Sequence, residues 1–220
     1  RIQPSLLVSD QARIATLSGG TAVAPMERRE FVELARKEGT AATADWVMDP
    51  EEIAVLLFTS GTTGAPKAAV LRHRHLVSYM FSAVEFGAAS ADDVALVAVP
   101  PYHIAGVISV ISSVYAGRRV VQMPNFNARA WLELARREKV TTAFLVPTML
   151  AQIVRELEGQ SGADLPHLSA LSYGGGKMPG PVIERAMQLF PHTQFTQAYG
   201  LTETSSTICV LLPEDHRAAI

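Results

Sequence analysis

The strongest constraint on the fold is a series of short apolar runs in which polar and apolar residues do not alternate. These runs occupy residues 6–8, 53–58, 94–99, 119–123, 141–146, 168–173 and 194–199. A strand buried on both faces carries apolar side chains at successive positions, whereas a strand with one solvated face alternates. The pattern therefore predicts a parallel sheet that is covered on both faces.

Segments with helical patterns separate these runs. Residues 26–38 and 73–86 place apolar side chains on one face, while residues 104–115 are apolar all round, which predicts a buried helix. Residue types favoured at a cap or in a first turn mark three further helix starts, at Asn127, Pro147 and Pro181. The alternation of strands and helices predicts a layered α/β fold with a parallel-rich sheet flanked by helices.

The composition indicates a globular chain and argues against a nucleic-acid partner. The 220 residues are 48% hydrophobic, and 19 Lys and Arg stand against 21 Asp and Glu, for a net charge of -2. Such a chain buries a core without disulfides and lacks the positive charge that a phosphate backbone attracts. The single cysteine, Cys209, cannot form an internal disulfide and suits a reducing cytoplasm.

Residues 94–117 form the longest uncharged stretch, which is long enough to span a bilayer. Pro100, Pro101 and His103 interrupt it. We therefore interpret the stretch as a buried strand, a break and a buried helix rather than as a transmembrane segment. The N-terminal residues lack the apolar core of a signal peptide, so a cytoplasmic protein is expected.

A loop rich in glycine and hydroxyl side chains follows the run at 53–58, and a helix is expected after it from about residue 72. The loop reads Thr59, Ser60, Gly61, Thr62, Thr63, Gly64, Ala65, Pro66 and Lys67. Between a strand and a helix, backbone N–H groups can converge on an anion, and Lys67 adds a positive charge. The spacing differs from that of the common nucleotide-triphosphatase loop. The residues alone leave a phosphate-binding loop and an ordinary turn as alternatives.

A second candidate segment ends the run at 194–199. Tyr199 can stack on a flat base, Gly200 follows it, and Thr202 offers a hydroxyl to a phosphate. Glu203 supplies a carboxylate, and proteins usually hold Mg²⁺ through one or two carboxylates together with substrate phosphates. Taken by themselves, these residues favour a strand cap followed by a solvated glutamate.

Two further features are candidates for ligand contact. Gly174, Gly175 and Gly176 permit close approach to the backbone, but Pro179 stands where a dinucleotide motif needs glycine. His103 has no acidic residue within nine positions, so the residues alone favour a capped or core histidine. The sequence shows no metal-ligand spacing and no Gly-x-Ser-x-Gly nucleophile motif.

Two motifs resemble those of the adenylate-forming (AMP-binding) enzymes, a superfamily of acyl- and aryl-CoA synthetases, peptide-synthetase adenylation domains and luciferases. Residues 56–67, LLFTSGTTGAPK, resemble the phosphate-loop motif of that superfamily at every position. Residues 199–203, about 140 positions later, resemble its Tyr-Gly-x-Thr-Glu motif. Ala68 stands where the family usually has glycine, and Gly176 and Lys177 where it often has alanine and proline. Lys177 is therefore interpreted as a solvated turn lysine.

The resemblance implies a set of site residues. Residues 59–64 and Lys67 would hold the phosphates of ATP, and residues 174–176 together with Tyr199 and Gly200 would contact the adenine. Thr202 would contact a phosphate and Glu203 would bind Mg²⁺. His103 would gate the acid-binding pocket, and Lys67, His103, Thr202 and Glu203 would form the catalytic set.

The resemblance also implies a reaction, in which ATP activates a carboxylic acid to an acyl-adenylate and CoA takes the acyl group, as in the acyl-CoA synthetase branch. Residues 104–115 contain no acid to pair a substrate ammonium, which favours a fatty, aryl or sterol-derived acid over an amino acid. An adenylation domain, a luciferase-like enzyme and a nucleotide-binding module without catalysis are the alternatives.

The family's further elements bear on the extent of the domain. They are a ribose-binding Asp, a hinge and a mobile C-terminal lid domain with a second lysine, and the resemblance places them beyond Ile220. We therefore expect residues 1–220 to be part of the N-terminal AMP-binding domain, without the lid domain. We also expect these residues alone to be inactive.

Overall fold

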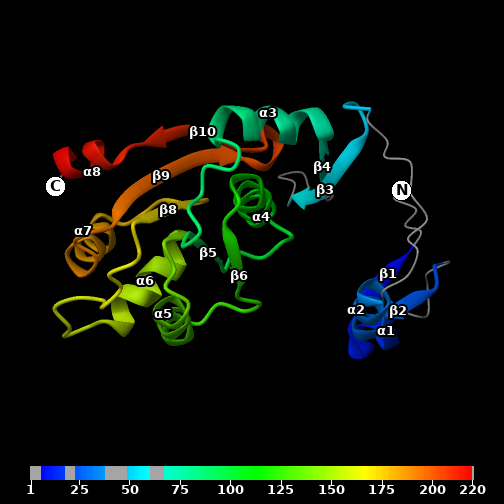
Figure 1. The fold of residues 1–220 in the computed structure, drawn as a ribbon, viewed down its shortest axis with the longest axis horizontal. Coiled ribbons are helices and arrows are strands. Elements are labelled where there is room, and N and C mark those ends of the chain that lie inside the picture. The colour runs from blue at the N-terminus through cyan, green and yellow to red at the C-terminus, as the bar shows by residue number, and fades with distance from the viewer. Residues whose placement is uncertain (1–5, 18–22, 38–48, 60–66, 220) are drawn as a thin grey trace. The chain divides into compact units, whose positions relative to one another are not determined.

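The computed structural model of the protein describes residues 6–17, 23–37, 49–59 and 67–219 (Figure 1). The chain divides into two compact units, Arg1–Met48 and Asp49–Ile220.

The first unit contains two strands and two helices among its described residues. They are β1 (Leu7–Ser9), α1 (Gln11–Leu17), β2 (Pro25–Glu27) and α2 (Arg28–Arg36). Strands β1 and β2 pair in parallel, with Val8 opposite Met26. Helix α2 begins where the Glu27 carboxylate accepts a hydrogen bond of 2.6 Å from the Arg29 N–H, which satisfies a backbone donor that the first turn leaves free. The predicted strand at 6–8 is present as β1, shifted by one residue and half-buried rather than covered on both faces, and the predicted helix at 26–38 is present with shorter bounds.

A six-stranded sheet forms the body of the second unit. Its strands are β5 (Val94–Val97), β6 (Arg119–Gln122), β7 (Thr142–Leu145), β8 (Ala170–Gly174), β9 (Gln194–Leu201) and β10 (Ser206–Leu211). They lie in the order β10-β9-β8-β7-β5-β6, and every pair is parallel except β9 with β10. The predicted parallel-rich α/β sheet is therefore confirmed, and the antiparallel edge strand β10 is an addition to it.

Three helices cover one face of this sheet and form the main core with it. They are α5 (Ala128–Arg137), α6 (Pro147–Glu156) and α7 (Gly180–Leu189) (Figure 1). Leu145 and Leu171 of the sheet, Trp131 of α5 and Ile153 of α6 belong to this core and are fully buried. The predicted helix starts are confirmed, and the Asn127 side chain accepts a 3.0 Å hydrogen bond from the Ala130 N–H as an N-cap.

The run at 53–58 is not a buried parallel strand, and this expectation was wrong. Strand β3 (Ile53–Thr59) pairs antiparallel with β4 (Lys67–Arg72), and the two form a separate two-stranded sheet. The glycine-rich loop therefore joins two strands instead of a strand and a helix. Every second residue of β4 is buried, Ala69 and Leu71, because the pair packs one face and leaves the other to solvent.

Helices α3 (His73–Ala83) and α4 (Ile104–Ala116) pack with the β3–β4 pair. Leu57, Leu71, Met80 and Ile108 form the centre of this second core. The predicted helix at 104–115 is confirmed as α4, but it is not fully buried, because Val114 is 68% exposed. In the described parts of the chain, no helix is both long and apolar enough to span a membrane.

Candidate active site

A cavity of about 930 Å³ lies where four of the parallel strands end. Its walls come from the segments that follow β5, β7 and β8 and from the last residues of β9. The carboxyl ends of parallel strands meet at one edge of a sheet, and ligands of open α/β sheets bind at that edge. We call this space the larger cavity. It is lined by Thr59, Val99, Pro100, His103, Ile104, Ala105, Phe144, Val146, Pro147, Thr148, Met149, Gly175, Gly176, Lys177, Ala198, Gly200, Leu201, Thr202, Glu203, Ser206 and Thr207.

Most of the described candidate residues meet in this cavity. Its lining contains Thr59, His103, Gly175, Gly176, Gly200, Thr202 and Glu203. Three other candidates, Lys67, Gly174 and Tyr199, are not among its lining residues. Ser60, Gly61, Thr62, Thr63 and Gly64 lie outside the described residues. The roles assigned to all of these residues stay predictions.

Lys67 is the first residue of β4 and lies directly opposite Thr59, the last residue of β3; we call this end of the strand pair its base. The two residues are register partners, and the Thr59 hydroxyl lies 3.5 Å from the Lys67 carbonyl oxygen. Strand β4 also contacts η1 (Thr202–Thr204), the 3₁₀ turn that follows β9. The two motifs, far apart in sequence, are therefore neighbours in space. The exposed Lys67 ammonium makes no ion pair with any residue that the structure describes.

The turn that carries Thr202 and Glu203 is held by its own backbone and by Thr204. The Thr204 hydroxyl accepts a 3.0 Å hydrogen bond from the Leu201 N–H and lies 3.1 Å from the Ser206 carbonyl oxygen. Ser205 and Ser206 adopt φ angles of 60° and 100°, values that cost a non-glycine residue free energy. Glu203 lines the cavity from this constrained turn, and within the described ranges its carboxylate has no basic partner.

Gly200 is required by this turn. A Cβ atom at Gly200 would overlap the backbone carbonyl of Ser206 on the neighbouring strand. In the sequence, Gly200 stands out only as part of a motif, because the crowding arises from the β9–β10 pairing and leaves no local mark in the sequence.

His103 is the N-cap residue of α4 and lies at the N-terminus of that helix. Its side chain makes no cap hydrogen bond, and its ring stacks obliquely on Tyr102 with the centroids 4.9 Å apart. His103 therefore borders the larger cavity, and its ring is not held by a cap hydrogen bond. Gly106 lets the first turn of α4 approach the Pro100 carbonyl, which a Cβ atom would overlap.

Tyr199 lies on the other face of β9 from its neighbours Ala198 and Gly200, because successive side chains of a strand alternate. Its side chain is 59% exposed, and it pairs in register with Cys209 of β10. Lys177, which the sequence analysis interpreted as a solvated turn lysine, is exposed and lines the larger cavity. The structure thus places a second lysine at the site.

The acidic, histidine and cysteine residues that the structure describes form no cluster of three that could hold a metal ion by themselves. Glu203 at the cavity supplies one carboxylate. This suits Mg²⁺, which takes few protein ligands when phosphates of a substrate complete its shell.

A sheet with a ligand-sized cavity at the carboxyl ends of its parallel strands is the arrangement of nucleotide-binding α/β proteins. The profile of one such family, described as AMP-binding enzyme, matches residues 5–220. The chain belongs to this family, and the resemblance seen in the sequence is confirmed.

Individual relatives show which members the chain is similar to. It is 35% identical over 171 residues to the fatty acid–acyl-carrier-protein ligase ScoC of Streptomyces coeruleorubidus, covering 76% of this chain and 33% of that protein. It is 29% identical over 175 residues to a 2-succinylbenzoate–CoA ligase of Arabidopsis thaliana, covering 79% of this chain and 31% of that protein. The chain thus spans about a third of the length of these curated relatives.

A solved structure agrees with the fold. The o-succinylbenzoate CoA synthetase of Bacillus subtilis, in complex with its acyl-adenylate intermediate, aligns with a TM-score of 0.78 and 26% identity. The alignment covers 97% of this chain and 42% of that one.

Proposed function

We propose that this chain is part of an enzyme that activates a carboxylic acid with ATP and passes the acyl group to the thiol of CoA. The observation that carries the proposal is that Thr59, at the base of the β3–β4 pair, lines the same cavity as Thr202 and Glu203. The two segments are thereby in reach of one nucleotide. Membership of the AMP-binding enzyme family supports the same reaction.

The residues at the cavity suit the chemistry of this reaction. A carboxylate is a poor electrophile, and joining it to AMP creates a good leaving group. The chain's own contribution is to hold the phosphates and to balance the charge that develops on them. Lys67 would supply a cation, and the hydroxyls of Thr59 and Thr202 would donate hydrogen bonds to phosphate oxygens. When bound, Mg²⁺ would neutralise phosphate charge, and Glu203 would hold it.

The proposal assigns the adenine to residues 174–176, Tyr199 and Gly200, and the gate of the acid pocket to His103. A structure of the related Bacillus subtilis synthetase in complex with ATP and a magnesium ion supports ATP and Mg²⁺ as ligands. We also propose that residues 1–220 are part of an N-terminal nucleotide-binding domain of a cytoplasmic enzyme. Fatty-acid metabolism is the pathway class that the fatty-acid ligase among the relatives supports.

Helix α4 and the named relatives narrow the class of acid substrate and the identity of the thiol that accepts the acyl group. Helix α4, which borders the larger cavity, contains no acidic residue to pair an ammonium, which supports a fatty or aryl acid over an amino acid. CoA is the proposed thiol, since the Arabidopsis relative is a CoA ligase. The ScoC relative, a ligase for an acyl carrier protein, favours a carrier-protein thiol as the second candidate.

The test is an assay of the full-length gene product with ATP, Mg²⁺ and a panel of fatty and aryl acids, offering CoA or a phosphopantetheinylated carrier protein. We expect AMP to be released in proportion to a new thioester, and only when an acid is present. Nucleotide binding without acid-dependent AMP release would contradict the proposal and would identify a binding module.

A further inference from the structure

A second cavity, of about 610 Å³, adjoins the larger one. Five residues line both spaces, so the two cavities share a wall. These residues are Ala105, Phe144, Ala198, Ser206 and Thr207. We call this space the smaller cavity. It lies on the face of the main sheet that α5, α6 and α7 leave uncovered, against α3 and α4.

The smaller cavity follows the length of α4. Ala105, Ile108, Ser109, Ser112 and Ser113 line it at the three- and four-residue spacing of one helix face. The axial rise from the first to the last of these residues is about 12 Å. The smaller cavity therefore extends along α4, from the residues that it shares with the larger cavity near the start of the helix towards the far end of the helix.

At that far end the cavity is lined by Arg118. The residue follows Gly117, the left-handed C-cap of α4, and its backbone N–H donates a 2.8 Å hydrogen bond to the Ser113 carbonyl. Nε of Arg118 is buried and has no hydrogen-bond partner. No ion pair joins its guanidinium to a carboxylate in residues 6–17, 23–37, 49–59 or 67–219. Arg118 is half-buried, and a buried Nε without a hydrogen-bond partner is unfavourable, so this position suits an anionic partner.

The sheet side of the smaller cavity carries hydroxyl groups. Thr142 of β7, Ser172 of β8 and Thr196 of β9 line it, and Ser172 and Thr196 are register partners. Their hydroxyls make no hydrogen bond to any described residue, whereas those of Ser109 and Ser113 each donate a 2.6 Å bond within α4. A purely apolar chain would leave the sheet hydroxyls without partners.

We propose that the acid substrate carries a second carboxylate, at the end remote from the one that is activated, and that Arg118 binds it. The proposal rests on the proposed function and names its substrate class. The planar guanidinium matches a carboxylate, which it can bind through two parallel hydrogen bonds. Among the described residues that line the smaller cavity, Arg118 alone is charged, so a singly charged carboxylate balances its charge better than a doubly charged phosphate. A cation there also repels a substrate ammonium, in agreement with the absence of acidic residues from α4.

The experiment compares α,ω-dicarboxylic acids with monocarboxylic acids of equal length, from adipic to hexadecanedioic acid. ATP–pyrophosphate exchange by the full-length gene product gives kcat/KM for each acid. We expect the wild-type protein to prefer the dicarboxylic member at the length that reaches Arg118. In Arg118→Met that preference falls by about tenfold or more, because a hydrogen bond between charged groups is lost. Arg118→Lys retains part of it.

Arg119→Met is the matched control. The Arg119 guanidinium donates a 2.8 Å hydrogen bond to Glu138 and does not line the smaller cavity, so we expect the preference to be unchanged. Arg118→Gln is the second neutral variant if the methionine variant does not fold.

An unchanged preference in both neutral Arg118 variants would overturn this inference, as would a wild-type preference for the monocarboxylic acid at every length. Both results leave the proposed function intact. If neither the dicarboxylic nor the monocarboxylic acids support ATP–pyrophosphate exchange, the proposed function is overturned, and this inference with it.

Discussion

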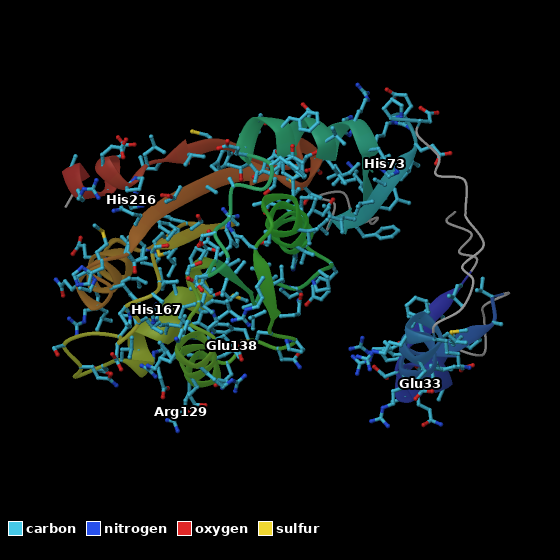
Figure 2. All side chains as sticks on the ribbon, viewed as in Figure 1. Glu33, His73, Arg129, Glu138, His167 and His216 are labelled. Atoms are coloured by element: carbon cyan, nitrogen blue, oxygen red, sulfur yellow. The ribbon has the colours of Figure 1, made fainter. Side chains whose placement is uncertain are left out.

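The hydroxyl of Tyr173 lies 2.8 Å from Nε2 of His216, and both side chains are buried. The other ring nitrogen, Nδ1, is 2.9 Å from the carbonyl oxygen of Leu212. A carbonyl can only accept, so Nδ1 carries a hydrogen, and in the neutral ring Nε2 accepts from the tyrosine hydroxyl, which also lies 3.4 Å from Oε1 of Gln197. This pair joins α8 (Pro213–Ala219) to β8 in the main sheet, and His216 is labelled on the ribbon in Figure 2.

Breaking this pair is expected to destabilise the second unit. Tyr173→Phe leaves a buried ring nitrogen without its donor, which costs about 1–3 kcal/mol in the free energy of unfolding. His216→Ala should cost at least as much, because it also leaves a cavity. His192→Ala, at an exposed histidine, is the control and should change stability by less than about 0.5 kcal/mol. Urea unfolding of the full-length gene product measures all three, and equal effects at His192 and His216 would contradict the account.

The same tyrosine predicts how stability depends on pH. Burial raises the pKa of Tyr173 above its ordinary value. The unfolded chain therefore loses this proton at a lower pH than the folded chain, and the free energy of unfolding falls as the pH rises above about 10. Below that pH the group contributes no pH dependence. Unfolding measured from pH 8 to 11 should show a steeper alkaline loss in the wild-type protein than in Tyr173→Phe, and parallel curves would contradict the prediction.

A substitution at Gly200 is expected to affect both the free energy of unfolding and nucleotide binding at the larger cavity. Gly200→Ala forces β10 away from β9, because the added methyl group would overlap the Ser206 carbonyl. We expect a loss of about 1–3 kcal/mol, typical of overpacking, together with weaker nucleotide binding because the turn with Glu203 lies between these strands. Gly162→Ala is the matched control, since its Cβ would meet its nearest neighbour, the Leu189 carbonyl oxygen, at 3.8 Å. Equal unfolding midpoints for the two variants would refute the argument.

The strands and helices of the main sheet could be predicted from sequence because their signals are local. Apolar runs mark β5 to β9, and Asn127 and Pro147 mark the starts of α5 and α6. Strand β4 was missed because its inward residues, Ala69 and Leu71, give a short and weak alternation. Its pairing with β3 also depends on a loop whose geometry the apolar pattern does not encode.

The candidate site was predictable to the extent that it lies in two motifs. Thr59, Thr202 and Glu203 belong to them, and their meeting in one cavity was the expectation that the resemblance supplied. The contribution of Ser205 and Ser206, whose left-handed backbone shapes the turn, could not be predicted from their residue types. Arg118 was also missed, because it has no neighbouring motif and gains significance only through the cavity that it lines.

The central claim is that the β3–β4 base and the turn after β9 hold one triphosphate. Its most direct measurement is acid-dependent ATP–pyrophosphate exchange by the full-length gene product, in the wild-type protein and in Lys67→Ala and Glu203→Ala. Each variant removes one charge-stabilising group, so we expect a tenfold to thousandfold loss, about the range seen for such groups. Glu214→Ala, at an exposed acid on α8, should keep the wild-type rate. Wild-type exchange in both Lys67→Ala and Glu203→Ala would contradict the account.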